Sequence, residues 1–114
     1  MNEIKRGEIY IMNFCSVVGS EQAGNRPAII VQNNTGNRHS PTTIVAAITS
    51  RNTKTILPTH IKIIVDGLES ESIVLLEQVR TVDKTRLKEY VGKADEKTMQ
   101  SIDRAIAISF GLEH

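Results

Sequence analysis

The chain has 114 residues, 39% of them hydrophobic, which suits one domain built around one core. Its 14 basic and 13 acidic residues leave a formal charge of +1, so any nucleic-acid binding must come from a local patch and not from an overall basic field. The single cysteine, Cys15, excludes an internal disulfide bond and a metal site made of cysteines alone.

The first third of the chain predicts two strands separated by a long polar loop. Residues 8–14 mix β-branched and aromatic side chains, which is typical of a strand. Residues 16–26 are rich in Ser, Gly, Glu, Gln and Asn, and irregular loops of this length in a compact domain are often functional. A second strand is expected over residues 27–32, with Pro27 at its first position, where a missing N–H does least harm.

The middle of the chain predicts a buried central strand between two loops. Residues 33–41 are rich in turn-forming residues, and residues 51–58 form a second, basic loop. Between them, the continuous apolar run over residues 43–49 predicts a strand that is buried on both faces. Residues 59–65 predict a further strand whose alternate isoleucine and valine side chains share one face.

The last third predicts two strands and an amphipathic helix. The strands are expected over residues 72–78 and 88–93, and Asp83 can cap a short helical turn between them. Asp95 is a suitable N-cap for a helix over residues 96–110. Four apolar side chains recur along that helix at spacings of 3, 4 and 4 and form one stripe, which must bury against the sheet: Met99, Ile102, Ile106 and Phe110.

A run of short strands closed by one amphipathic helix predicts a mainly β protein, a curled sheet or small barrel of antiparallel strands. No repeat or linker divides the chain, so one domain is expected over residues 1–111, and residues 112–114 resemble the start of an expression tag. The charged N-terminus does not fit a signal peptide, and no apolar run approaches the roughly 20 residues of a membrane helix. We therefore expect a cytoplasmic protein that does not bind membranes.

Most motifs that carry chemistry are missing from the sequence. It has no glycine-rich phosphate-binding loop and no nucleophile elbow. Its histidines, His39, His60 and His114, lie far apart and have no partner at the spacing of a metal site, so neither a metal nor another cofactor is expected. We interpret His39 as a solvated loop residue and His60 as a structural one.

The pattern that remains places polar residues where loops meet rigid strands. Arg26 joins the polar loop to the strand that begins at Pro27, and Thr49 ends the buried central strand. Arginine suits phosphate because its planar guanidinium donates two parallel hydrogen bonds. By spacing alone, phosphate binding by Arg26 and a solvated surface arginine remain equally good interpretations.

A series of short motifs runs along the chain as far as about residue 111. They lie at residues 5–10, 18–22, 25–27, 30–33, 36–38, 40–41, 44–49, 57–60 and 75–81, and they include Asn-Arg-Pro and Ala-Ala-Ile-Thr. In this order and spacing the set resembles the MazF/PemK family of toxin endoribonucleases, most nearly those of Gram-positive bacteria.

The resemblance implies a fold, an activity and partners. Members of this family have an SH3-like barrel related to the gyrase-poisoning toxin CcdB, and they act as homodimers. They cleave single-stranded RNA at short sequences without a metal, and leave 2′,3′-cyclic phosphate and 5′-hydroxyl ends. An acidic, initially disordered MazE-like antitoxin occupies the RNA groove of the dimer and neutralises the toxin.

The resemblance also implies which residues form the site. The essential arginine of the Arg-Pro motif falls on Arg26, and the essential threonine falls on Thr49. Between Val65 and Ser72 the chain is shorter than similar toxins and lacks their aromatic residue, so contacts made there are not carried over. The residues expected to border the RNA or to line the base-reading surface are Ser20, Glu21, Gln22, Asn33, Pro58, Glu77 and Gln78.

The chemistry of such a cleavage assigns different roles to Arg26 and Thr49. Attack of a 2′-hydroxyl on phosphorus develops charge on the non-bridging oxygens, which the Arg26 guanidinium can stabilise at any relevant pH. The Thr49 hydroxyl is a poor base, and we expect it to position the scissile phosphate by hydrogen bonding. The general base stays open: it is either Glu21, or no residue at all in a site that mainly positions its substrate.

Two other functions are compatible with this fold class. A gyrase-binding toxin like CcdB relies on a C-terminal segment with a tryptophan, which this chain lacks. An RNA-binding barrel that does not cleave usually offers several aromatic stacking platforms, and this chain has only two tyrosines and two phenylalanines. We expect a basic patch around three loops, attractive to RNA and to an acidic antitoxin alike, made of Arg26, Arg38, Arg51 and Lys54.

Overall fold

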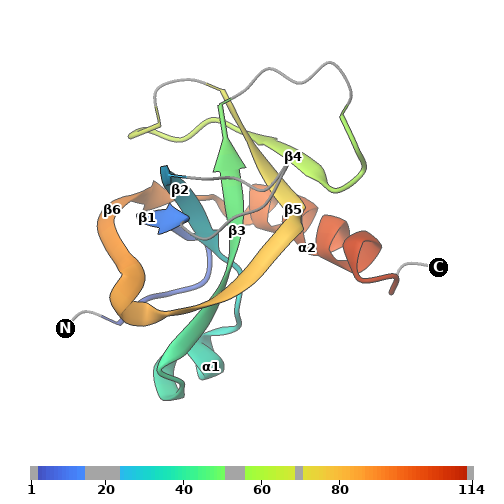
Figure 1. Cartoon of the computed structure of the whole chain (residues 1–114). Coiled ribbons are helices and arrows are strands. Elements are labelled where there is room, and N and C mark those ends of the chain that lie inside the picture. The colour runs from blue at the N-terminus through green and yellow to red at the C-terminus, as the bar shows by residue number, and fades with distance from the viewer. Residues whose placement is uncertain (1–2, 15–23, 51–55, 69–70, 113–114) are drawn as a thin grey trace.

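The computed structural model of the chain describes residues 3–14, 24–50, 56–68 and 71–112 (Figure 1). Within these ranges the backbone forms six strands, two α-helices and one 3-10 turn. In chain order they are β1 (Glu8–Phe14), β2 (Gly24–Ile30), α1 (Asn34–His39), β3 (Thr42–Thr49), β4 (His60–Ile63), β5 (Ser72–Asp83), η1 (Lys84–Arg86), β6 (Leu87–Lys93) and α2 (Glu96–Ser109).

One antiparallel sheet organises the fold. Its strands follow the order β4-β5-β3-β2-β1-β6, and every neighbouring pair is antiparallel. Figure 1 shows β5 crossing the molecule and continuing through η1 into β6, which lies at the other edge of the sheet. The expected mainly β fold with a C-terminal helix is confirmed. In the described part of the chain the sheet is curled and open, because no pairing joins β4 to β6.

The two faces of the sheet bury different side chains. One face packs against α2, so that Ile29 and Ile48 of the sheet share a core cluster with Ile102 of the helix. The opposite face, which we call the inner face, lies on the concave side of the curl. Its buried side chains form a second cluster: Ile4, Met12, Phe14, Ala28, Ile30, Val45, Ala47 and Val82.

The C-terminal helix begins where the sequence predicts it. The Asp95 carboxylate accepts the backbone N–H of Thr98 at 2.8 Å and so satisfies one of the free donors at the helix start. Three members of the predicted stripe, including Ile102, pack against the sheet. Phe110 does not, since it lies past the last helical turn as the C-cap and is 59% exposed. Ala105 completes the buried stripe in its place.

The expected loop over residues 33–41 is wrong, because most of it forms the helix α1. Asn33 caps this helix by accepting the backbone N–H of Gly36 at 2.8 Å. Asn37 is buried, and its side chain donates to the carbonyl of Gln32 at 2.9 Å and accepts from the Thr43 hydroxyl at 2.7 Å. These polar contacts stabilise a helix whose short sequence shows no apolar periodicity.

Three strand boundaries also differ from those expected. β2 begins at Gly24 and not at Pro27, so that the proline lies within the strand, opposite Ile11 of β1. β4 is shorter than the expected strand over residues 59–65. β5 extends to Asp83, well past residue 78. The capped turn at Asp83 and the strand β6 are confirmed.

Candidate functional site

The predicted catalytic pair lies on neighbouring strands. Arg26 lies in the first half of β2, and Thr49 ends β3. The register of the two strands pairs Ala28 with Ala47, and the same register continued by two residues sets Arg26 opposite Thr49. Because neighbouring strands are about 4.8 Å apart, the two residues lie side by side at one end of the sheet.

Both residues belong to the inner face. Successive side chains of a strand point to opposite faces. Met12, the β1 partner of Arg26, and Ala47, two residues before Thr49, are both buried on the inner face. The Thr49 residue is 2% exposed, whereas Arg26 is only partly buried. A buried threonine beside a partly buried arginine is an arrangement that can hold a phosphate group against the end of the sheet.

Strands β5 and β4 extend this face further. Thr49 pairs with Ile73 on β5, and Ile73 pairs with Lys62 on β4. In the adjacent row, His60 pairs with Leu75. Residues that pair directly across a sheet share a face, so His60 and Lys62 project from the same face as Thr49, about 10 Å away across two strand spacings.

The Glu77 carboxylate is held by two neighbouring residues of the segment that leads into β4. The Thr59 hydroxyl donates to Oε1 at 2.9 Å, and Nε2 of His60 is hydrogen-bonded to Oε2 at 2.8 Å. Nδ1 of His60 accepts the backbone N–H of Leu57 at 3.3 Å. The imidazole therefore makes one hydrogen bond through each of its ring nitrogens.

These contacts control the charge of Glu77. Partial burial raises the pKa of the carboxyl group. Hydrogen bonds from His60, from its own backbone N–H and from Thr59, together with the attraction to His60, outweigh that effect and hold the pKa below its ordinary value. The group is therefore an ionised acceptor at neutral pH and a weak base.

Glu77 and Gln78 lie at an irregularity in the pairing of β5 with β3. Ala46 and Ala47 are consecutive on β3, but their β5 partners, Val79 and Leu75, are four residues apart. The register therefore shifts at residues 76–78, which form a bulge in β5 and include both of its predicted base-reading residues. Bulges bend a strand and redirect its side chains, and they are frequent beside active sites.

The structure brings only some of the predicted RNA-contacting residues together. Pro58 is exposed and adjoins Thr59 at the Glu77 cluster. Asn33 does not join this group, because it caps α1 beyond the other end of β2. Four residue steps separate Arg26 from the end of β2, or about 13 Å. The remaining predicted residues lie outside the described ranges: Ser20, Glu21, Gln22, Arg51 and Lys54.

The expected basic patch is therefore changed. Arg38 lies on α1 in an ion pair with Glu3 at 3.6 Å, and within one chain it is remote from Arg26. Lys62 was not predicted, although it is exposed on the inner-face side and has no hydrogen bond or ion pair within the described residues. The spacing of two residues already places Lys62 on the same face as His60, but only the strand pairing shows that Thr49 shares this face.

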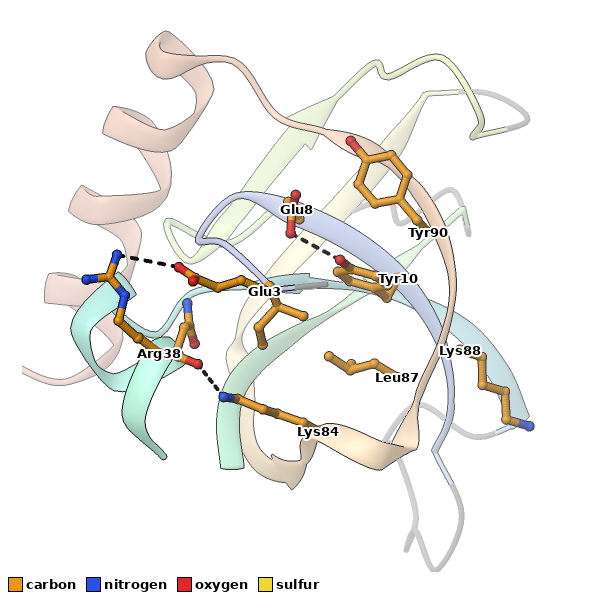
Figure 2. Close-up of a pocket in the computed structure, with 10 residues that line it drawn as sticks. Glu3, Glu8, Tyr10, Arg38, Lys84, Leu87, Lys88 and Tyr90 are labelled. Atoms are coloured by element: carbon orange, nitrogen blue, oxygen red, sulfur yellow. Dashed lines mark hydrogen bonds and ion pairs between the residues drawn. The ribbon is translucent and has the colours of Figure 1, made fainter. Parts of the chain in front are cut away.

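A separate hollow lies toward the opposite end of β1, with a volume of about 730 Å³. Figure 2 shows Tyr10 and Tyr90 close together at its wall, with ring centroids 5.6 Å apart in an edge-to-face arrangement. The Tyr10 hydroxyl donates to Glu8 at 3.1 Å, and Lys84 reaches a backbone carbonyl of α1. Neither Arg26, Thr49 nor Glu77 lines this hollow.

The described residues contain neither a metal-binding cluster nor a membrane-spanning helix. No group of three His, Cys, Asp or Glu side chains there could hold a metal ion. No helix in those ranges is long and apolar enough to cross a membrane.

Comparison with known proteins gives consistent matches. The family model described as "PemK-like, MazF-like toxin of type II toxin-antitoxin system" matches residues 5–110. Endoribonuclease EndoA of Bacillus subtilis (strain 168) is 48% identical over 111 residues, covering 96% of each chain. Endoribonuclease MazF of Staphylococcus saprophyticus is 49% identical over 111 residues, covering 96% of this chain and 92% of the relative.

A solved structure shows the same fold. It is an endoribonuclease from a mycobacterial species in complex with its cognate antitoxin, and it superposes with a TM-score of 0.78 at 28% identity. The match covers 100% of this chain and 99% of the other.

Proposed function

Because this chain belongs to the PemK-like, MazF-like family of toxins of type II toxin–antitoxin systems, we propose that it is a sequence-specific endoribonuclease that cleaves single-stranded mRNA. The observation that carries the proposal is the register that sets Arg26 opposite Thr49 on the inner face. This arrangement offers one charged and one neutral donor to a single phosphate group.

The proposed reaction is an internal transesterification. The 2′-oxygen attacks the adjacent phosphorus and loses its proton, while the bond to the 5′-oxygen of the next nucleotide breaks and that oxygen gains a proton. The products are a 2′,3′-cyclic phosphate and a 5′-hydroxyl. Arg26 stabilises the charge on the non-bridging oxygens, and Thr49 holds the phosphate in line for attack. No step requires a metal or an organic cofactor.

Proton transfer and base recognition are assigned to different carboxylates. Glu77 is a poor general base, since its pKa is lowered and both of its oxygens already accept hydrogen bonds. We assign it, with Pro58 and Gln78, to base recognition. Glu21 remains the candidate base, and the alternative is still a site that acts mainly by positioning, with Ser20 and Gln22 bordering the RNA.

The proposed partners are RNA, a second copy of the chain and an antitoxin. A MazE-like antitoxin is supported by the mycobacterial endoribonuclease that is described in complex with its cognate antitoxin. A homodimer would explain why Asn33 and Arg38 lie far from Arg26 in one chain, because they could contact RNA that crosses both subunits. We place the enzyme in the cytoplasm, where its substrate is found.

The test is a digest of a mixed transcript pool by the purified protein in excess EDTA, with the cut ends mapped. We expect cuts at one short sequence, with 5′-hydroxyl ends that a kinase can phosphorylate and full activity despite the chelator. Strict dependence on Mg²⁺ would contradict the mechanism. Inhibition of gyrase without RNA cleavage would support the CcdB-like alternative.

A further inference from the structure

We propose that His60 is a positioning residue for RNA sequence recognition: it holds the Glu77 carboxylate where a base can be read, without needing to touch the RNA. The inference rests on the proposed function, in which Glu77 contacts a base. It assigns to His60 a role beyond that of a structural histidine at the start of β4.

The burial of the two side chains separates their roles. The His60 side chain is 7% exposed, whereas the Glu77 side chain is 35% exposed. The imidazole is thus covered by protein, and the carboxylate is the part that a ligand can reach. An ionised carboxylate has about four lone-pair positions, so the two bonds from Thr59 and His60 leave room for donors from a ligand.

The His60 imidazole is also held by a hydrogen bond at Nδ1, the ring nitrogen that does not contact Glu77. The segment before β4 turns back on itself, since the backbone N–H of His60 donates to the Leu57 carbonyl at 2.9 Å. The N–H of Leu57 in turn donates to Nδ1 of the ring. Rotation of the ring would break both side-chain contacts, so His60 transmits the position of a rigid turn to the carboxylate.

Glu77 needs such support because it lies in the bulge. The register with β3 shifts at residues 76–78, and on the β4 side the backbone N–H of Leu76 donates to the Thr59 carbonyl at 2.9 Å. The segment before β4 therefore holds both the backbone of the bulge and its exposed carboxylate. A free glutamate would lose considerable rotamer entropy when it binds a base, and one that is already held loses less.

A fixed carboxylate selects bases by their hydrogen-bond donors. Single-stranded RNA exposes the Watson–Crick edges of its bases, and a carboxylate pairs well with an exocyclic amino group. At the position that Glu77 reads, we therefore expect a base with an amino group to be preferred over uracil. Losing alignment should relax that preference and leave the chemistry at Arg26 and Thr49 intact.

The experiment compares kcat/KM on the preferred RNA with kcat/KM on RNAs that carry one base change at each position of the cut sequence. Glu77→Gln should reduce discrimination at one position by about 10-fold or more, the scale of one good base contact. His60→Ala should relax the same position, and His60→Gln should restore part of it because its amide can donate. His39→Ala, at the exposed end of α1, is the matched control and should change nothing.

The double variant provides the decisive comparison. If His60 acts through Glu77, adding His60→Ala to Glu77→Gln should cause no further loss of selectivity. If His60→Ala instead lowers cleavage of all RNAs equally and also lowers the Tm, His60 has only a structural role and the proposal is overturned. Unchanged selectivity in Glu77→Gln would overturn it as well, because there would be no reading contact to support.

An RNA-free measurement separates this inference from the proposed function. NMR titration of the Glu77 carboxyl should show its pKa rising in His60→Gln and His60→Ala relative to the unmodified protein, whatever the protein cleaves. If the pKa of Glu77 responds to His60 but the protein does not cleave RNA, the proposed function is refuted and the contact between the two side chains stands. If the pKa of Glu77 does not change in the His60 variants, the positioning role is refuted.

Discussion

Arg26 and Thr49 differ in burial in the way that their proposed roles require. The Thr49 hydroxyl lies where β3 is paired with β5, so its direction is set by the sheet. Arg26 lies in the first half of β2, opposite Met12 of β1, and it is only partly buried. One group therefore contributes position, and the other contributes charge at the solvent-facing side of the site.

We expect Arg26→Ala and Thr49→Val each to lower kcat by about 10²-fold or more, the scale of losing one preorganised donor to a developing negative charge. Valine keeps the branched shape of Thr49 and removes only its hydroxyl. Cleavage of a defined RNA measures the effect, and Arg104→Ala on the exposed side of α2 is the control. Near-normal rates in either site variant, with the fold intact by circular dichroism, would show that the pair is not catalytic.

Tyr10 is a second residue whose environment can be measured. Burial, the charge and hydrogen bond of Glu8, and the neighbouring Tyr90 raise the pKa of Tyr10 from 10.0 to about 12. Because the folded state favours the protonated phenol, this contribution to stability is complete below pH 10 and is lost as the pH rises toward 12. Ultraviolet titration should show a step near pH 12 that Tyr10→Phe removes and Glu8→Gln moves toward 10. A step that Glu8→Gln leaves in place would contradict the assignment.

Among the elements, the bulge of β5 and the segment before β4 form one unit. Neither is regular structure by itself, and each supplies the hydrogen-bond partners that the other lacks. The unit lies opposite Ala46 and Ala47 of β3, and it presents the partly exposed carboxylate of Glu77. The proposed function thus assigns recognition and catalysis to neighbouring strands of the same sheet.

A substitution at Gly67 tests how closely the turn after β4 packs against β6. Gly67 has a φ of +98°, and a Cβ added there would lie 2.5 Å from the Val91 carbonyl of β6. Gly67→Ala should therefore lower the free energy of unfolding by about 1–3 kcal/mol, through backbone strain and overpacking together. Gly111→Ala has a similar φ of +72° but no described atom within 4 Å, so it controls for backbone strain alone. Equal losses of stability in urea denaturation would refute the close contact.

For the molecule as a whole, the near-neutral charge makes the location of each cation important. Lys62 extends the line of Thr49 and Ile73 to the β4 edge, whereas Arg38 and Lys84 lie near the other hollow. RNA that follows the inner face should therefore meet Arg26 and Lys62. Of the described residues, this path keeps Arg26 from the expected patch, adds Lys62 and leaves out Arg38.

We expect Lys62→Gln to weaken RNA binding and to reduce the slope of log K against log salt by about 0.7, as expected for one lost phosphate contact on a single strand. The binding assay uses a non-cleavable RNA at several salt concentrations. Lys88→Gln removes the same charge beside the other hollow and should leave the slope unchanged. Equal effects of the two variants would indicate non-specific attraction and not a defined path.

We also expect RNA and the antitoxin to compete for overlapping surface. Charge reversal at Arg51 and Lys54 should weaken the binding of both RNA and antitoxin, because phosphates and carboxylates are attracted to the same cations. It should also make the affinity of each ligand less dependent on salt concentration. A competition titration with non-cleavable RNA and the Arg26→Ala protein measures this directly. Simultaneous, independent binding of both ligands would eliminate the shared surface.

The sequence by itself determined most elements and the family resemblance, and the Arg26–Thr49 pair is a prediction that follows from that resemblance. Strand and helix periodicity depends on neighbouring residues, and Asp83 and Asp95 act on backbone groups two and three residues away, so this information is local. Sequence alone can single out the two catalytic candidates because each lies in a short motif that is recognisable along the chain.

Only the tertiary structure decided how the site is assembled. His60 and Glu77 are 17 residues apart, and their contact depends on a bulge that no periodicity indicates. The helix α1 depends on the buried contacts of Asn37, and the separation of Asn33 and Arg38 from Arg26 depends on the direction of β2. The physical reason is the same in each case. Local patterns determine which face a side chain takes, whereas strand pairing, register and buried hydrogen bonds determine which distant side chains share it.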